Sequence, residues 1–223
     1  MKIVVCIKQV PDTNEVKIDE KTGTLIRAGV PSIVNPDDLH AAEQALQLKD
    51  ENPDVHVTVL SMGPPQADVA IKEVYAMGAD EAILLTDRVF AGSDTWATAT
   101  ILAAAIRKIG DVDIVFCGRQ AIDGDTAQVG PELAEFLGVP QITYVRSLEI
   151  KGKTVVAERA VEDGHFVIEA PMPVVLTAIK DLNHPRYPLM PRIYDAYSPE
   201  GNIKKWTNED IGADLTQIGI KNS

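Results

Sequence analysis

Short apolar runs alternate with amphipathic stretches along the first two thirds of the chain. The run from Ile3 to Ile7 contains no polar residue, which is typical of a parallel strand buried on both faces. Similar runs predict four more strands, at residues 55–60, 81–85, 114–117 and 141–145. Helices are predicted between them, at residues 35–50, 66–77, 96–109 and 131–137. This alternation indicates an α/β fold with a doubly wound parallel sheet and right-handed crossovers.

The pattern changes after Arg146, where strands follow one another without helices between them. Tight turns at Lys151-Gly152 and Asp163-Gly164 separate them, so we predict an antiparallel extension from about residue 147. Its strands are expected at residues 148–150, 154–159, 165–168 and 174–176. A small hairpin is also expected near the N-terminus, with strands at residues 15–19 and 25–28 around a turn at residues 21–23.

The last part of the chain carries little amphipathic pattern, and five prolines fall between Pro171 and Pro191. We therefore divide the chain into one α/β domain, residues 1–184 with the antiparallel extension, and an extended C-terminal arm, residues 185–223. A monomer would gain little from such an arm, so we expect it to wrap a partner chain.

The charge, the cysteines and the lengths of the apolar runs limit which ligands the protein is expected to bind and where it is expected to be located. The 223 residues carry 33 acidic and 21 basic side chains, and the net charge of −12 argues against binding to a nucleic-acid polymer. Cys6 and Cys117 lie in apolar runs, so we expect buried free thiols. No apolar run approaches the roughly 18 residues of a membrane span. Met1-Lys2 leads directly into the first strand, so no signal peptide is expected and we predict a cytoplasmic protein.

Loops at the carboxyl ends of the strands are where an open α/β sheet binds ligands. The most unusual of them is Gly118–Gly130, which is long, polar and rich in small residues and leads into a helix N-terminus. Its backbone N–H groups can receive an anion without many cations. From spacing alone, a solvated loop with aspartate turns is an equal alternative.

Motifs for other chemistry are absent from the sequence. There is no G-x-G-x-x-G after a strand, no G-x-x-x-x-G-K-[ST] loop and no G-x-S-x-G elbow. An EF-hand loop beginning at Asp123 would need Glu where Ala134 stands, and the four histidines lack metal-ligand spacing, so no metal site is predicted. Catalysis by the protein's own side chains is poorly supported, whereas a bound redox cofactor would need no such groups.

Several blocks of sequence follow one another in order along essentially the whole chain. They are Val4–Asp12, Asn35-Pro36, Ala76–Asp80, Phe90–Thr95, Gly118–Asp123, Glu158-Arg159, Pro173–Thr177 and Pro185–Pro191. Together they resemble the β subunit of electron transfer flavoprotein. The resemblance implies an α/β fold of the adenine-nucleotide-binding type, in agreement with the predicted strands and helices. It also implies a heterodimer with a larger α subunit that carries the electron-transferring FAD.

The resemblance further implies a ligand in the β subunit: a structural AMP in conventional members, or a second FAD, with its ADP part in the same site, in bifurcating members. The implied contact residues are Cys6, Asn35, Pro36, Asp37, Asp38, Met62, Gly118, Arg119, Gln120, Ala121, Ile122, Asp123, Gly124, Asp125, Thr126, Ala127, Gln128 and Val129. The helix start at Asp94, Thr95 and Thr98 is assigned to the pyrophosphate region. Arg119, Asp123 and Thr126 are the preferred candidates within the loop.

The same loop separates the two subfamilies. Conventional members have Asp-Asp-Asp after Ala-Ile and lack a Gly-Pro before the next helix. This chain has Asp123-Gly124-Asp125-Thr126 and Val129-Gly130-Pro131, and so resembles the bifurcating form. Gly124 leaves room for a ribityl–pyrophosphate path. The resemblance then implies FAD as cofactor, with AMP as the alternative, NADH as hydride donor, and both ferredoxin or flavodoxin and an acyl-CoA dehydrogenase as electron partners.

The family's anchor for the partner dehydrogenase maps onto the segment after Pro185-Arg186-Tyr187. The implied partner-binding residues are Pro188, Leu189, Met190, Pro191, Arg192 and Ile193, with Met190 at the apolar anchor position. Two other functions stay open: a conventional electron carrier with AMP in the same pocket, and a non-redox ATP-binding module similar to stress proteins.

Overall fold

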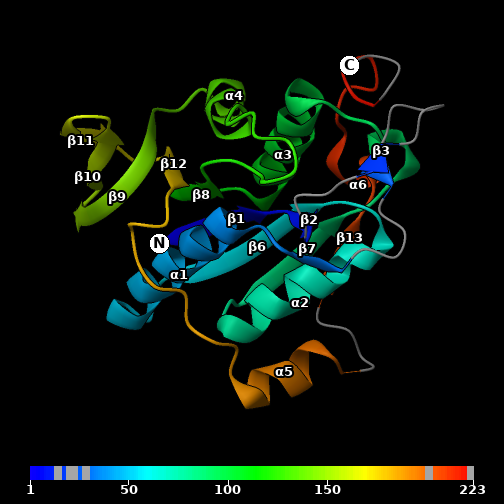
Figure 1. Ribbon diagram of the computed structural model, residues 1–223, viewed down its shortest axis with the longest axis horizontal. Coiled ribbons are helices and arrows are strands. Elements are labelled where there is room, and N and C mark those ends of the chain that lie inside the picture. Colours follow the sequence, from blue (N-terminus) through cyan, green and yellow to red (C-terminus); the bar gives the residue numbers. More distant parts are fainter. Residues whose placement is uncertain (13–16, 19–24, 27–30, 199–202, 220–223) are drawn as a thin grey trace.

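One twisted sheet runs through the molecule, with helices on both faces (Figure 1). The computed structural model describes residues 1–12, 17–18, 25–26, 31–198 and 203–219. Within these ranges, nine strands form the sheet in the order β11-β10-β9-β12-β8-β1-β6-β7-β13. Their bounds are β1 Lys2–Ile7, β6 His56–Met62, β7 Glu81–Leu85, β8 Ile114–Gly118, β9 Gln141–Lys151, β10 Thr154–Val161, β11 Gly164–Pro171, β12 Val174–Ala178 and β13 Ile203–Trp206.

The sheet reverses its order between β1 and β8. From β1 the chain moves outward through β6 and β7 on one side, and through β8 and β12 on the other. Neighbouring strands from β9 across to β13 are parallel, and only β10 and β11 are antiparallel to their neighbours. The predicted doubly wound α/β fold is therefore confirmed. A reversal of this kind is where such sheets bind ligands.

Four helices bury the two faces of the sheet. α1 (Pro36–Glu51) and α2 (Asp68–Met77) cover one face, and α3 (Thr95–Ile109) and α4 (Val129–Leu137) cover the other (Figure 1). In β1, Ile3 and Val5 pack toward α1 and α2, whereas Val4 and Cys6 pack in the opposite cluster. Burial on both faces explains why the sequence of β1 is an unbroken apolar run. Short 3-10 helices, η1 (Pro65–Ala67) and η2 (Arg88–Phe90), precede α2 and α3.

The expected N-terminal hairpin is described only in part. β3 (Lys17–Ile18) and β4 (Leu25–Ile26) pair antiparallel, which confirms the pairing, while the expected turn at residues 21–23 lies outside the described residues. A second antiparallel pair, β2 (Gln9–Pro11) with β5 (Ser32–Val34), was not predicted from the sequence.

One strand prediction after Arg146 is wrong. Residues 174–176 belong to β12, which is not antiparallel but lies between β8 and β9 and runs parallel to both. The hairpin β10–β11 extends the sheet beyond β9, and the chain then crosses back over β9 to form β12. This hairpin stands where a helix usually connects parallel strands. Residues 148–150 are not a separate strand but the far end of β9, which exchanges its partner β12 for β10 along its length.

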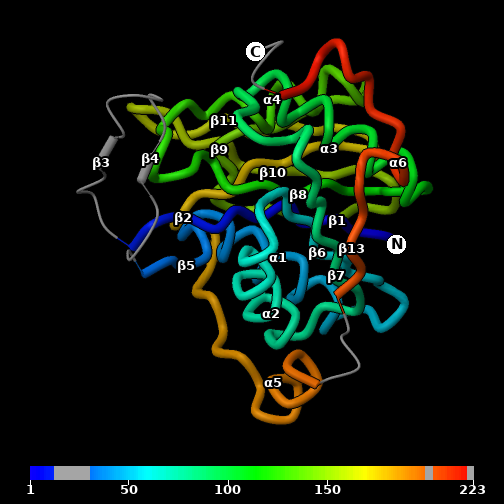
Figure 2. The backbone as a smooth tube through the Cα atoms, turned by 90° about the vertical axis from the view of Figure 1, so that its right-hand side faces the viewer, coloured from blue at the N-terminus to red at the C-terminus, as the bar shows by residue number. Residues whose placement is uncertain are grey.

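Residues 185–198 and 203–219 also differ from the extended arm that we predicted. They include α5 (Met190–Ala196), β13 and α6 (Asn208–Ile211), and they lie along this chain's own helices and sheet (Figure 2). β13 extends the sheet by pairing in parallel with β7, and Ala213 and Ile218 are buried beneath it in the α3 face. β7 and β13 are far apart in the sequence, so no local sequence pattern indicates that they pair. Contact with a partner chain stays a prediction.

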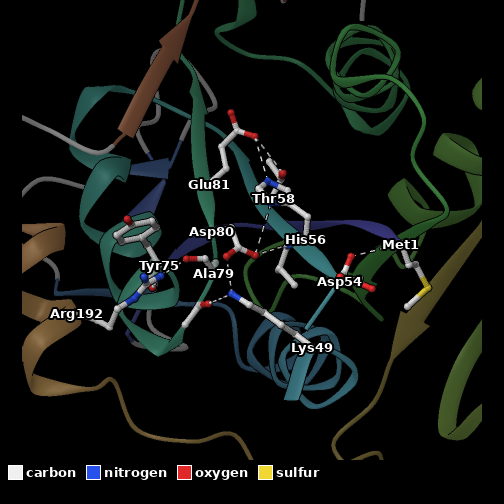
Figure 3. A network of polar contacts seen from close by, with 12 residues as sticks. Met1, Lys49, Asp54, His56, Thr58, Tyr75, Ala79, Asp80, Glu81 and Arg192 are labelled. Carbon is white, nitrogen blue, oxygen red and sulfur yellow. Dashed lines mark hydrogen bonds and ion pairs between the residues drawn. The ribbon is translucent and has the colours of Figure 1, made fainter. Parts of the chain in front are cut away.

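Two arginines fasten the segment around α5 to the domain. The Arg186 guanidinium pairs with the buried Glu43 carboxylate of α1 at 2.8 Å and with Asp50 at 2.6 Å. Arg192 lies over the Tyr75 ring, 4.6 Å from its centroid, and donates to the carbonyl oxygens of Tyr75 and Ala79 at the end of α2 (Figure 3). Arg192 therefore adds a cation and hydrogen-bond donors at the C-terminal end of α2, where the helix dipole is negative.

One carboxylate joins the two halves of the sheet at the reversal. Asp38, in the first turn of α1, is only 6% exposed. Its Oδ2 accepts a hydrogen bond from the Lys8 N–H at 2.7 Å, just beyond β1, and its Oδ1 accepts one from the Gly118 N–H at 3.0 Å, at the end of β8. A Cβ on residue 118 would lie 2.2 Å from Asp38 Oδ1, so the approach requires glycine. Burial raises the pKa of Asp38 to about 7, although these hydrogen bonds oppose the rise.

We expect the Asp38→Asn variant to lack the part of the wild type's unfolding free energy that depends on the protonation of Asp38. Because the pKa of Asp38 rises from 3.8 to about 7 on folding, the native state binds this proton more tightly than the unfolded chain does. The resulting stabilisation is complete below the unfolded pKa and is lost as the pH rises toward the folded pKa, about 4 kcal/mol in all.

Urea unfolding at about pH 5 and about pH 8 measures this effect. The wild type should lose stability relative to Asp38→Asn between the two pH values. Exposed Asp54→Asn serves as the control for removing one carboxylate. A difference between wild type and Asp38→Asn that stays constant with pH would contradict the assignment.

Candidate functional site

The predicted ligand contacts gather at the carboxyl edge of the sheet, around its reversal. They come from the ends of β1, β6 and β8, from the loop after β8, and from the first turns of α1, α3 and α4. Cys6 and Met62, at the ends of β1 and β6, face the side of the sheet that α3 and α4 cover. The predicted partner-binding residues 188–193 lie away from this edge, against the end of α2.

Asn35 holds the loop rather than capping α1. It occupies the N-cap position and is 1% exposed, but its side chain makes no capping hydrogen bond. Its Nδ2 donates to the carbonyl oxygen of Gln120 at 2.8 Å and to Asp38 Oδ1 at 3.0 Å, and its Oδ1 accepts from the Ile122 N–H at 3.1 Å. The Asn35 side chain thus supplies hydrogen-bond partners to partly buried backbone groups of the loop.

Charged side chains fix the rest of the loop. Asp123, whose side chain is 3% exposed, pairs with the Lys8 ammonium at 2.7 Å. Gln120 Nε2 donates to Asp125 Oδ1 at 2.7 Å. Arg119 Nε lies 3.3 Å from Asp37 Oδ2, yet it is buried and makes no hydrogen bond in this geometry. Most of the predicted ligand-binding side chains in this part of the site therefore already contact protein.

The surroundings of Asp37 shift the pKa of its carboxyl group. Burial raises the pKa of Asp37, and the neighbouring Arg119 guanidinium opposes that rise. The Arg119 guanidinium beside Asp37 offsets part of the negative charge that an anionic ligand would meet at the start of α1.

The backbone of the loop is what stays available to a ligand. Asp125 and Ala127 have left-handed φ values of 50° and 53°, which are costly for residues other than glycine. Within the part of the chain that the structure describes, the N–H groups of Thr126, Ala127 and Gln128 donate to no protein acceptor. Consecutive N–H groups on a backbone that alternates between right- and left-handed residues form a concave anion site. The arrangement fits a phosphate or pyrophosphate.

The first turns of α3 and α4 border this anion site. Asp94 caps α3, because its carboxylate accepts from the Ala97 N–H at 2.8 Å. Thr95 Oγ1 donates to Glu132 Oε1 of α4 at 3.1 Å and lies 3.4 Å from Gln128 Oε1. Thr98 stands one turn into α3, where its N–H bonds the Asp94 carbonyl. The positive ends of both helix dipoles therefore point to the same place.

Sequence reasoning missed two residues at this edge. Lys8 follows β1 at its carboxyl end, and its position beyond a buried strand was the signal that could have identified it. Glu132 lies in the first turn of α4. Acidic residues are common there because they interact favourably with the helix dipole, so nothing in the sequence indicated another role for Glu132.

Several other expectations concern groups near the site. Cys6 and Cys117 are buried free thiols, as predicted. A hydrogen bond with Cys6, together with burial, raises the pKa of the Cys117 thiol. In the described ranges, no cluster of three or more His, Cys, Asp or Glu side chains is placed to hold a metal ion. The same ranges contain no helix with the length and apolar character that crossing a bilayer requires.

Comparison with known proteins identifies the family. The family model described as "Electron transfer flavoprotein domain" matches residues 22–210. The electron transfer flavoprotein subunit beta of Clostridium acetobutylicum is 60% identical over 223 residues, covering 100% of this chain and 85% of the relative. The caffeyl-CoA reductase-Etf complex subunit CarD of Acetobacterium woodii is 56% identical over 223 residues, with coverage of 100% and 84%.

A third relative, the acryloyl-CoA reductase electron transfer subunit gamma of Anaerotignum propionicum, is 50% identical over 228 residues, covering 100% of this chain and 85% of the relative. The match of the family model spans most of the chain, and these identities extend over all of it. The chain therefore belongs to the electron transfer flavoprotein family, as a β subunit.

Proposed function

We propose that this β subunit binds FAD at the carboxyl edge of its sheet and, with an α subunit, takes part in flavin-based electron bifurcation. The observation that carries the proposal is the loop after β8, with three consecutive N–H groups that have no protein acceptor in the described chain. Two relatives carry names that refer to caffeyl-CoA reductase and acryloyl-CoA reductase, which supports an acyl-CoA-oxidising or -reducing partner enzyme.

The residues at this edge would divide the ligand between them. The N–H groups of Thr126, Ala127 and Gln128 would hold the pyrophosphate, assisted by the N-termini of α3 and α4. Arg119, whose buried Nε has no hydrogen-bond partner in the described chain, would bring positive charge to the flavin or phosphate. Bound there, FAD would supply the redox chemistry: acceptance of a hydride from NADH and one-electron transfer to ferredoxin or flavodoxin and to the α-subunit flavin.

Gly124 favours FAD over the alternative ligand, AMP. A Cβ at this position would meet no protein atom within 4 Å, and the backbone is not left-handed there. Neither packing nor backbone conformation in the subunit therefore requires glycine, and the absence of a side chain there leaves room for a ligand. In a conventional carrier, the same N–H groups would hold the phosphate of a structural AMP. The two proposed ligands therefore differ only in the part attached beyond that phosphate, which FAD has and AMP lacks. A cytoplasmic location is part of the proposal and rests on the sequence alone.

The central test is the visible spectrum of the purified heterodimer. Two flavins per heterodimer and reduction of flavin by NADH are the expected results. One FAD with one AMP, and no reduction by NADH, would establish the conventional carrier instead. A complex without flavin would leave only a nucleotide-binding module.

Replacing Gly124 with Asp should remove the second flavin but keep AMP binding. The added carboxylate would occupy the path beyond the phosphate, whereas the protein has no atom near enough to be displaced. We expect flavin content to fall from two to one per heterodimer with an unchanged thermal unfolding temperature. Gly124→Ala should give a smaller loss. Full flavin content in Gly124→Asp would show that the FAD path lies elsewhere.

The partner dehydrogenase is proposed to dock on the exposed apolar side chains around α5. Met190 is 66% exposed and Tyr194 74%, and Tyr187, just before the helix, is 91% exposed. The Arg186 and Arg192 contacts hold this surface in place without the partner. Large apolar groups presented on a fixed backbone lower the entropic cost of association.

Met190→Ala should slow electron transfer to the dehydrogenase by about tenfold while flavin reduction by NADH is unchanged. Stopped-flow measurement of both steps tests this, with Val167→Ala as the matched control. Val167 is also exposed, at 64%, but lies on β11 at the other end of the sheet. Equal effects of the two variants would rule out a specific role for α5.

A further inference from the structure

A buried acceptor without a donor lies beside the anion site. Glu132, in the first turn of α4, accepts a hydrogen bond from Thr95 Oγ1 through its Oε1 at 3.1 Å. Its second oxygen, Oε2, is buried and has no hydrogen-bond partner within the part of the chain that the structure describes. A buried carboxylate oxygen without a donor is unfavourable, since it has lost water and gained nothing in exchange.

The hydroxyl of Thr95 does not satisfy Glu132 Oε2 as well as Oε1. Thr95 offers one O–H, and it lies near two acceptors, Glu132 Oε1 and Gln128 Oε1. A hydroxyl carries a single proton, so it satisfies one acceptor at a time. Thr95 therefore leaves Glu132 Oε2 without a donor, and no other described residue donates to that oxygen in this geometry.

Glu132 follows directly on the loop whose backbone N–H groups would hold a phosphate, and its side chain shares Thr95 Oγ1 with the Gln128 side chain. Gln128 provides the last of these N–H groups, and its carbonyl oxygen accepts from the Glu132 N–H at 3.0 Å. The carboxylate thus stands one helical turn beyond the anion site. A second phosphate there would be repelled by the carboxylate, whereas a neutral hydroxyl joined to the bound phosphate would supply the missing donor.

We propose that Glu132 is a ligand-binding residue whose Oε2 accepts a hydrogen bond from a sugar hydroxyl of the bound nucleotide. Carboxylates bind ribose hydroxyls in the same way in other doubly wound folds. The hydroxyl belongs to the ribose or to the ribityl chain; both present the same chemistry. The inference rests on the proposed nucleotide site, and it adds a residue that selects the part of the ligand next to the phosphate.

The competing role for Glu132 is structural. Through Thr95 it connects the first turns of α4 and α3, and the edge-on contact of Trp96 with Phe136 joins the start of α3 to the end of α4. In that role Glu132 would affect stability and would weaken all nucleotides equally, whatever hydroxyls they carry.

The test measures discrimination between ligands by titration calorimetry on the heterodimer freed of its β-site nucleotide. The probes are AMP, 2′-deoxy-AMP and 3′-deoxy-AMP, then FAD and an FAD analogue lacking a ribityl hydroxyl. Wild type should lose about tenfold in affinity when the contacted hydroxyl is removed. In Glu132→Ala that loss should shrink to within about twofold, and Glu132→Gln, which keeps an acceptor, should restore part of it.

Glu135→Gln is the matched control, because Glu135 is an exposed acid on the same helix. Loss of discrimination among the AMP analogues places the contact at the ribose, and loss only among the FAD analogues places it at the ribityl chain. Discrimination that stays at the wild-type level in Glu132→Ala overturns the inference and leaves the structural role. Wild type that binds none of the probes overturns the proposed nucleotide site as well, so the two failures are distinct.

Discussion

The Asp38 carboxylate accepts hydrogen bonds from both strands that flank the reversal of the sheet and from the Asn35 side chain beside it. All these donors are shielded from solvent, so displacement of the carboxylate would leave them without an acceptor. The start of α1, the end of β8 and the loop that follows are consequently fixed relative to one another. Gly118 makes the arrangement possible, since any side chain there would collide with the carboxylate. The geometry of the candidate site therefore depends on a group that does not need to touch the ligand.

Side chains fix the loop and backbone N–H groups are left for the ligand, which explains how an acidic protein can hold an anion. Asn35, Asp38 and Asp123 are directed at the protein itself, where they fix the loop. The groups left for the ligand are peptide N–H donors, whose positive potential comes from peptide dipoles and not from net charge. A chain with a net charge of −12 can therefore bind a phosphate locally while its surface repels nucleic acid.

The sequence revealed those features that depend on local pattern. Ile3–Ile7 and the other apolar runs identified parallel strands, because burial on both faces forbids polar alternation. Gly118–Gly130 stood out as a ligand loop from its composition, but the left-handed backbone at Asp125 and Ala127 carries no glycine to signal it. The parallel pairing of β12, the pairing of β13 with β7 and the loop-holding role of Asn35 all arise from contacts between distant residues. No local pattern encodes them.

The pairing of β13 with β7 has a consequence for how the chain is made. Residues 81–85 leave the ribosome long before residues 203–206, the strand that covers them. During that interval β7 is an edge strand whose hydrogen-bonding groups are open to any other extended chain. Closing the edge requires the ends of a long segment to meet, which is an entropically slow event. Self-association during biosynthesis is therefore the hazard built into this topology, and completion of the C-terminal region ends it.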